Sequence, residues 1–219
     1  MAPSAQKPRS LSLVRAPTGL DDPATSDDAK DAQLVEALRE GHPGAPAALF
    51  DRYGPLVNRV LLRVLGGGAD HDDRVQETFL EALRSVHTLR DAGALRPWMT
   101  TIAARVARAE LRRRRLRRFF WLDAETPAPE PAVHDDHAAR DALRATWRVL
   151  DQMPTDERLA FTLRFIHNEE LTLVADACDC SLATVKRRLA RAEARFVALC
   201  QQHPELVRRL ADGGRWSPP

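Results

Sequence analysis

The sequence predicts an all-α protein in which two helical domains are joined by a flexible acidic linker. Apolar residues recur at spacings of three and four through most of the chain, which is the period of a helix face, and no segment alternates as a strand does. A stretch rich in proline and acids at residues 119–139 interrupts this periodicity and predicts the linker. The segments on either side, residues 31–118 and 140–203, are therefore expected to form the two domains.

The first helices follow a leader that shows no periodicity. Residues 1–30 are rich in Pro, Ser, Ala and Asp, which predicts disorder. A first helix begins near Asp31 and stops at the break "GHPGAP". A second helix has apolar residues at helical spacing from Ala47 to Val64, and "LGGGADHDD" then predicts a turn with helix-capping acids.

A third helix carries two faces of different chemistry. Its polar stripe, at spacings of three and four, contains Asp73, Gln76, Glu77 and Glu81. The apolar residues that are expected to face elsewhere are Val75, Phe79, Leu80 and Leu83. Such a stripe suits either solvent or a basic protein partner, and the residues alone leave both interpretations open.

The fourth helix runs from Trp98, with Pro97 in its first turn, through the basic segment "RVARAELRRRRLRR" at residues 105–118. This segment has eight arginines and a single acid, Glu110. All but three of the 33 Lys and Arg residues of the chain are arginine. Arginine pairs bidentately with phosphate, which favours a nucleic-acid surface, although a GC-rich genome would produce the same bias and a solvated helix face remains possible.

The second domain ends in a pair of helices joined by a tight turn. Helical spacing resumes at Leu143, breaks at Met153-Pro154, and continues to Ile166. The segments "LTLVADAC" and "LATVKRRLARAEARF" follow, separated by "DCS", in which Ser181 is a suitable N-cap. This arrangement predicts a helix-turn-helix whose second helix can enter a major groove, with an ordinary helical hairpin as the alternative. Residues 204–219 are expected to form a C-terminal tail.

Several functional classes lack their sequence signatures in this chain. No P-loop, metal-ligand cluster or nucleophile constellation occurs, so we expect no cofactor, no metal and no enzymatic activity. The three cysteines are expected to be small buried residues in a reducing cytoplasm. No apolar run of about 18 residues and no signal peptide occurs, which predicts no membrane insertion. The histidines that lack ligand spacing, and are interpreted as surface residues, are His71, His87, His134, His137 and His167.

Two segments resemble the sigma-70 family of bacterial initiation factors. "HDDRVQETFLEAL", followed by "RPWMTTIAARVARAELRRRR", resembles region 2 of that family. "MPTDERLAFTLRFIHNEELTLVADACDCSLATVKRRLARAEARF" resembles region 4. Because only these two regions occur, in this order and on a short chain, the sequence resembles the extracytoplasmic-function (group IV) sigma factors. The resemblance covers about residues 31–118 and 140–200.

The resemblance implies partners and residue roles. The implied partners are promoter DNA, core RNA polymerase through its β′ clamp and β subunit, and an anti-sigma factor, and the implied location is the cytoplasm at the nucleoid. The positions that match the clamp-binding residues are Asp73, Gln76 and Glu77. Those expected at the −10 element are Trp98, Arg105, Arg108, Arg112, Arg113, Arg114 and Arg115. Those expected at the −35 element are Ser181, Thr184, Lys186, Arg187, Arg188 and Arg191.

Some positions depart from the family pattern or allow a second interpretation. Arg105 stands where the family commonly has Asn, and Asp179 stands where the helix-turn-helix commonly has Gly. Trp98 can stack on unpaired bases or pack in the core. The competing functions are a polymerase-independent helix-turn-helix regulator and a sigma-like interaction module that has lost promoter recognition.

Two further expectations concern the linker. "FFWLD", residues 119–123, is expected to pack on the first domain or to form part of an inhibitor-binding surface. The linker acids between Asp123 and Asp136 are expected to compete with DNA for the arginines in the free protein.

Overall fold

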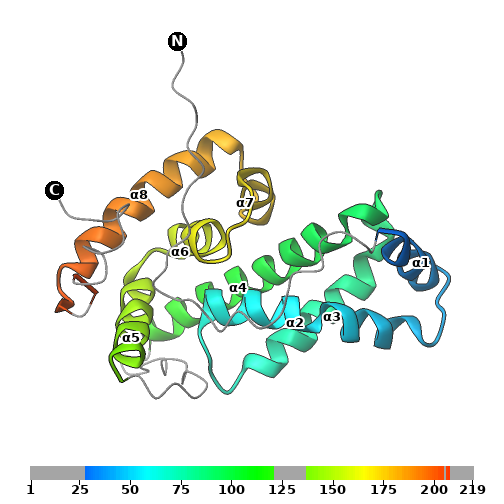
Figure 1. Ribbon diagram of the computed structural model, residues 1–219, viewed down its shortest axis with the longest axis horizontal. Helices are drawn as coiled ribbons and strands as arrows, with labels where there is room; N and C mark the ends of the chain where they lie inside the picture. The colour runs from blue at the N-terminus through cyan, green and yellow to red at the C-terminus, as the bar shows by residue number, and fades with distance from the viewer. Residues whose placement is uncertain (1–27, 121–136, 205, 208–219) are drawn as a thin grey trace, which may run out of the picture.

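The computed structural model describes residues 28–120, 137–204, 206 and 207, and within this part the chain is helical with no strand (Figure 1). The predicted all-α class is therefore confirmed. The first domain contains α1 (Asp28–Arg39), α2 (Ala45–Leu65), α3 (His71–Ser85), short 3₁₀ turns at Val86–Thr88 and Ala92–Ala94, and α4 (Leu95–Phe120). The second contains α5 (His137–Gln152), α6 (Thr155–Phe161), the π-helical turn η4 (Thr162–Ile166), α7 (Leu171–Ala177) and α8 (Leu182–Cys200).

The core of the first domain forms where α2 packs on α3 and α4. Helix α2 buries one side, including Val57, Val60 and Leu61, which have no exposed surface. Met99 and Ala103 of α4 are equally buried. Gly66, which follows α2, has a φ of 75°, a backbone conformation that glycine adopts without strain, and this turn directs the chain back into α3.

Helix α4 is a single helix of 26 residues, so it is about 39 Å long. On one side of its first half, apolar residues such as Ile102 and Val106 are buried in the core. Its second half is mostly arginine. Pro97 lies in its first turn, as predicted, where no backbone N–H is required. The expected boundary of the linker at residue 119 falls inside the helix, because α4 continues to Phe120.

The second domain is built on α6 and α8, which share an aromatic cluster. The rings of Phe161 and Phe196 stack with centroids 4.5 Å apart, and Phe165 lies 5.0 Å from Phe161. Cys178 and Cys200 are buried, as expected, whereas Cys180 is only partly buried, and burial raises the pKa of the Cys178 thiol to about 11. Leu206 is also fully buried, so the packed part of this domain extends beyond residue 203.

Helices α7 and α8 form the predicted helix-turn-helix. Asp179, in the turn, has a φ of 51°, the left-handed conformation for which the usual residue is glycine. Ser181 is the N-cap of α8, because its hydroxyl accepts a hydrogen bond from the backbone N–H of Thr184 at 3.3 Å. Both local features agree with the expectations from the sequence.

The two domains pack against each other. Helix α4 contacts both α6 and α7, and α2 contacts η4, so the second domain lies along the fourth helix of the first (Figure 1). Periodicity predicted the two domains but gave no sign of this contact. Residues 121–136, for which flexibility and a role of the acids were expected, lie outside the described residues. Most of the leader also lies outside them.

Candidate nucleic-acid and polymerase interfaces

The polar stripe on α3 is partly exposed and partly paired within the domain. Asp73 and Gln76 are exposed. Glu77 is half-buried and forms an ion pair with Arg74, which lies one turn earlier on the same helix. The expectation that Leu80 faces away from this stripe is wrong, because 51% of Leu80 is exposed. Leu80 follows Asp73 by seven residues, about two helical turns, so an apolar side chain extends the polar face.

The arginine segment of α4 is organised by its one acid. Only 2% of the Glu110 side chain is exposed, and four arginines lie within ion-pair distance of its carboxylate. Arg117 and Arg114 are nearest, at 2.8 and 3.0 Å, and Arg114 also donates to the Leu65 carbonyl oxygen at the end of α2. The other two are Arg113 and Arg74, which also pair with Glu77. The side chains of this cluster therefore brace α2, α3 and α4 together.

The remaining arginines of the segment at residues 105–118 divide into two groups. Arg108 and Arg112 pair with Asp156 of α6, and Arg118 pairs with Asp151 of α5. Arg105 and Arg115 are exposed and have no carboxylate partner within the described residues. Of the −10 candidates with a guanidinium, these two are therefore the ones that can meet DNA without first leaving a carboxylate.

Trp98 lies one turn into α4 and is half-buried against the hydrophobic core. One part of the indole therefore packs inside the protein and another part is open to solvent. Both interpretations of this residue, core packing and base stacking, remain compatible with its position, and its role at the −10 element stays a prediction.

The recognition helix α8 presents candidate readers and paired arginines side by side. Lys186 and Arg187 are exposed, and the guanidinium of Arg187 donates to the Thr184 hydroxyl at 3.4 Å. Arg188, by contrast, pairs with Asp156, and Arg191 pairs with Glu157. The sequence places all of these on outer surfaces, but the structure separates those that are free of carboxylates from those that are held.

The expectation that His167 is a surface residue is wrong. Its side chain is 5% exposed and lies between the domains, where Nδ1 accepts a hydrogen bond from Arg63 of α2 at 2.8 Å. Burial, and then the positive charges of Arg63, Arg96 and Arg59, lower the pKa of His167 to about 3. His167 is therefore neutral near pH 7, with Nε2 carrying the proton and facing Glu169 at 3.5 Å.

A second buried polar group joins the two domains. Arg158 of α6 is 2% exposed, and its Nε donates to the Val64 carbonyl oxygen in the last turn of α2 at 2.9 Å. Its guanidinium also pairs with Asp151 and lies 5.8 Å from the ring centroid of Trp147. Arg158 stands beside apolar residues at helical spacing, so only the tertiary arrangement reveals that it is buried.

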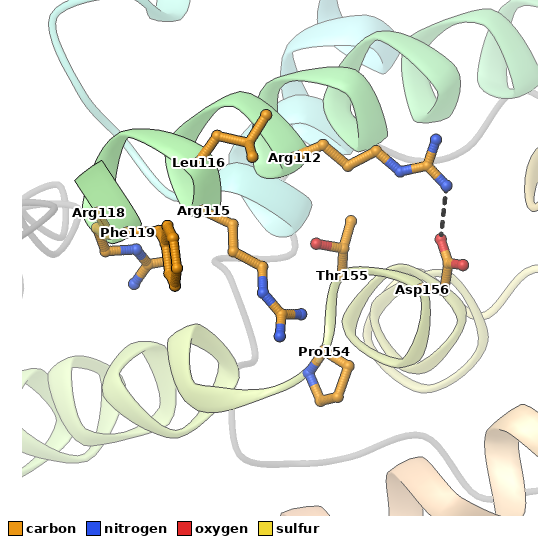
Figure 2. A pocket seen from close by; sticks show the side chains of 8 residues that line it. All are labelled: Arg112, Arg115, Leu116, Arg118, Phe119, Pro154, Thr155 and Asp156. Carbon is orange, nitrogen blue, oxygen red and sulfur yellow. Dashed lines mark ion pairs between the residues drawn. The ribbon is translucent and has the colours of Figure 1, made fainter.

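An open cleft of about 820 Å³ separates the end of α4 from the start of α6 (Figure 2). One wall comes from α4 and carries arginines together with two apolar side chains, Leu116 and Phe119. The other wall is Pro154, Thr155 and Asp156, and the ion pair from Arg112 to Asp156 crosses between the walls (Figure 2). Phe119 is 81% exposed, so of the two expectations for residues 119–123, packing on the first domain is wrong for this residue.

The all-helical fold, the helix-turn-helix and the arginine-rich helix define a DNA-binding class of transcription protein. The chain matches the descriptions "Sigma-70 region 2" over residues 49–117 and "Sigma-70, region 4" over residues 143–196. It belongs to the sigma-70 family of RNA polymerase sigma factors, and its relatives include sigma factors of the extracytoplasmic-function type.

Individual relatives support this assignment, and a solved structure shares the fold. The chain is 33% identical over 129 residues to the RNA polymerase sigma factor CarQ of Myxococcus xanthus, which covers 59% of this chain and 74% of that protein. It is 31% identical over 187 residues to the ECF RNA polymerase sigma factor BldN of Streptomyces coelicolor, with 80% and 68% covered. The solved structure of CnrH in complex with the cytosolic domain of CnrY shares the fold, with a TM-score of 0.56, 23% identity and coverage of 79% and 98%.

Proposed function

We propose that this chain binds core RNA polymerase and directs promoter-specific transcription initiation, as a regulatory subunit that performs no covalent chemistry. The observation that carries the proposal is the pairing of two helical regions of one family. One has a partly exposed acidic stripe beside an arginine-rich helix, and the other has a capped helix-turn-helix with basic exposed residues. In this proposal, binding energy from these surfaces drives strand opening, so no catalytic group is required.

The α3 face is proposed to bind the β′ clamp. Asp73 and Gln76 are exposed and available to a basic partner, whereas Glu77 must first leave Arg74 and Arg113 or bind together with them. Leu80 adds an exposed apolar side chain to the same face. Protein interfaces commonly combine an apolar centre with a polar rim, so this composition supports a docking role better than a purely solvated stripe.

The DNA contacts are proposed on two helices. On α4, Trp98 offers a partly open indole for an unpaired base, and Arg105 and Arg115 offer guanidinium groups for the backbone near the −10 element. On α8, Lys186 and Arg187 are proposed to contact the −35 element in the major groove.

An anti-sigma factor and a cytoplasmic location at the nucleoid complete the proposal. Support for the first comes from two structures that share the fold: the complex of CnrH with CnrY, and the sigma factor RpoE in complex with the anti-sigma factor NepR from Bartonella quintana. The second of these has a TM-score of 0.53 at 21% identity and covers 68% of this chain and 92% of that one. Across the described ranges of the chain, no helix has the length and apolarity that a membrane crossing requires.

The test of this function is co-purification with core polymerase. Asp73→Arg should abolish the stoichiometric complex, because a like charge placed against a basic partner costs several kcal/mol. Glu40→Arg makes the same change at an exposed position just after α1 and should leave the complex intact. Circular dichroism checks that both variants remain helical. Equal co-purification of the two variants and wild type would show that the α3 face does not bind polymerase.

A further inference from the structure

We propose that a cavity between the end of α4 and the second domain is a binding site for a small polyphosphate, an anion of the size of triphosphate. This arginine pocket has a volume of about 330 Å³ and adjoins the open cleft of Figure 2. The arginines that line it come from α4, α6 and α8, and are Arg115, Arg118, Arg158 and Arg195. The inference is independent of the proposed function, since it concerns a small anion and the chain without polymerase.

Positive charge in the arginine pocket exceeds negative charge. Arg118 and Arg158 share the two oxygens of Asp151, which also lines the pocket. Arg195 pairs with Glu157 at 2.8 Å. The four guanidinium groups therefore have only two carboxylates between them, which leaves positive charge for a further anion to neutralise.

Arg115 is the guanidinium of this pocket that is available without breaking an ion pair. Its side chain is exposed, reaches from α4 toward Pro154 and Thr155 (Figure 2), and has no carboxylate partner within the described residues. A phosphate group bound there would complete a charge-assisted pair that the described residues do not supply. The planar fork of arginine binds phosphate oxygens bidentately, so phosphate suits this position better than a spherical ion such as chloride.

The buried arginine of the pocket shows that positive charges lie close together here. Only 2% of the Arg158 side chain is exposed, and burial lowers the pKa of its guanidinium. Asp151 opposes this effect, whereas the charges of Arg114 and Arg118 lower the pKa further. An anion in the pocket would offset the repulsion among these arginines and would thereby stabilise the packed domains.

The lining favours a phosphate chain over a base. A volume of about 330 Å³ is at the lower end of the range for small-molecule sites, roughly 300–1,000 Å³. None of the described residues that line the pocket is aromatic, so no ring is present on which a base could stack. Charge and size therefore point to a triphosphate group, which is supplied either as the inorganic anion or by a nucleotide.

Both domains contribute to this site. Arg115 and Arg118 belong to the first domain, whereas Arg158 and Arg195 belong to the second. A bound polyphosphate should therefore stabilise the packing of one domain on the other. Because the unfolded chain has no such pocket, binding should also raise the melting temperature.

Isothermal titration calorimetry of the full chain with sodium tripolyphosphate, at constant ionic strength, measures the affinity. Binding should have a stoichiometry of one and a Kd of about 1 mM or less. ATP should bind about as tightly as tripolyphosphate, and adenosine should not bind, because the pocket contacts the phosphates. Sulfate should bind at least about tenfold more weakly, since a single group reaches fewer arginines. Absence of tripolyphosphate binding, or equal binding of sulfate, would overturn the proposal.

Two matched variants separate this pocket from the general charge of α4. Arg115→Ala should weaken tripolyphosphate binding by about tenfold, through the loss of one charge-assisted contact. Arg105→Ala removes an arginine from the same helix that is also exposed and does not line the pocket, and it should bind tripolyphosphate like wild type. Equal weakening by the two variants would assign the anion to the arginine surface of α4 as a whole and would overturn the proposal.

A measurement on wild type covers the case in which Arg115→Ala fails to fold. Thermal unfolding of the wild-type chain should shift to higher temperature as tripolyphosphate is added, and by more than with sulfate at the same ionic strength. A melting temperature that does not change with tripolyphosphate would contradict the proposal. Polymerase is absent from each of these measurements, so their failure is distinguishable from a failure of polymerase binding.

Discussion

At the scale of single residues, identity alone does not determine which basic side chain can meet DNA. Arg187 and Arg188 are neighbours on α8, yet the first is exposed without a carboxylate and the second is held by Asp156. One helical step turns a side chain by about 100°, which is enough to move it from open solvent to an intramolecular partner. We therefore rank Arg187 above Arg188 as a reader of the −35 element.

Arg187→Ala should cost about 1–3 kcal/mol of discrimination between promoter and altered −35 sequences if Arg187 contacts a guanine. Electrophoretic mobility shifts of the polymerase holoenzyme on matched and mutated promoters measure this difference. Arg148→Ala removes an exposed arginine of α5 and should change neither affinity nor discrimination. A uniform loss on all sequences would instead assign Arg187 to a phosphate.

Some residue-level features were predictable because they depend on neighbours in sequence. Ser181 caps α8 because a hydroxyl before a helix can reach a backbone N–H three residues on. Leu80 and His167 were predicted wrongly because their exposure depends on which helix packs against them. Apolar character suggested a buried leucine and isolation suggested an exposed histidine, and tertiary packing reversed both.

At the scale of elements, the turn of the helix-turn-helix stores backbone strain at Asp179. Its φ of 51° lies in the left-handed region, which costs a residue with a Cβ about 1–2 kcal/mol. An acidic side chain tolerates this conformation better than most. The position of α8 relative to α7 therefore depends on Asp179, which adopts the left-handed conformation of the turn at a higher energetic cost than glycine would.

Asp179→Gly should stabilise the protein by about 0.5–1 kcal/mol, because relief of strain exceeds the entropy that glycine adds to the unfolded chain. Asp176→Gly makes the same change inside α7 and should destabilise by about 0.5–1 kcal/mol. Thermal unfolding of both variants beside wild type gives the two signs. A lower melting temperature for Asp179→Gly would mean that the aspartate side chain itself stabilises the turn.

The helices themselves could be predicted, since periodicity and the breaks at Gly and Pro depend on local sequence. The arginine segment of α4 shows what periodicity leaves out. Its eight arginines look equivalent in the sequence, but six of them pair with Glu110, Asp151 or Asp156, and Arg105 and Arg115 have no carboxylate partner within the described residues. Two of those acids belong to the other domain, so this division could be known only after the domains were placed.

At the scale of the whole molecule, the domain contact contains a neutral histidine where positive charges are dense. Arg63 lies against Nδ1 of His167, and burial, with Arg63, Arg96 and Arg59, lowers the pKa of this residue to about 3. Glu169 faces the other ring nitrogen at 3.5 Å and does not offset these effects. A proton added to His167 would therefore oppose the packing of α2 on η4.

Stability should fall as pH decreases below about 6.5, because the unfolded histidine takes up a proton that the folded one refuses until pH 3 is approached. The expected loss from this group is about 1.4 kcal/mol for each pH unit within that window. Burial also lowers the pKa of His71, which contributes in the same direction. Urea unfolding at about pH 7.5 and 5.5 should therefore show a weaker pH dependence for His167→Gln than for wild type. Equal pH dependence would exclude His167 as a source of it.

The uninterrupted length of α4 has a consequence for the spacing of its contacts on a promoter. Trp98 and Arg115 are separated along the helix axis by about 26 Å, which equals roughly seven to eight base-pair steps of a DNA strand. The two ends of this helix can therefore contact different base-pair steps of the promoter. The backbone hydrogen bonds of the helix keep the distance between these contacts constant. Inserting one residue between them would lengthen this separation by only about 1.5 Å but would rotate the arginines by about 100° around the helix axis.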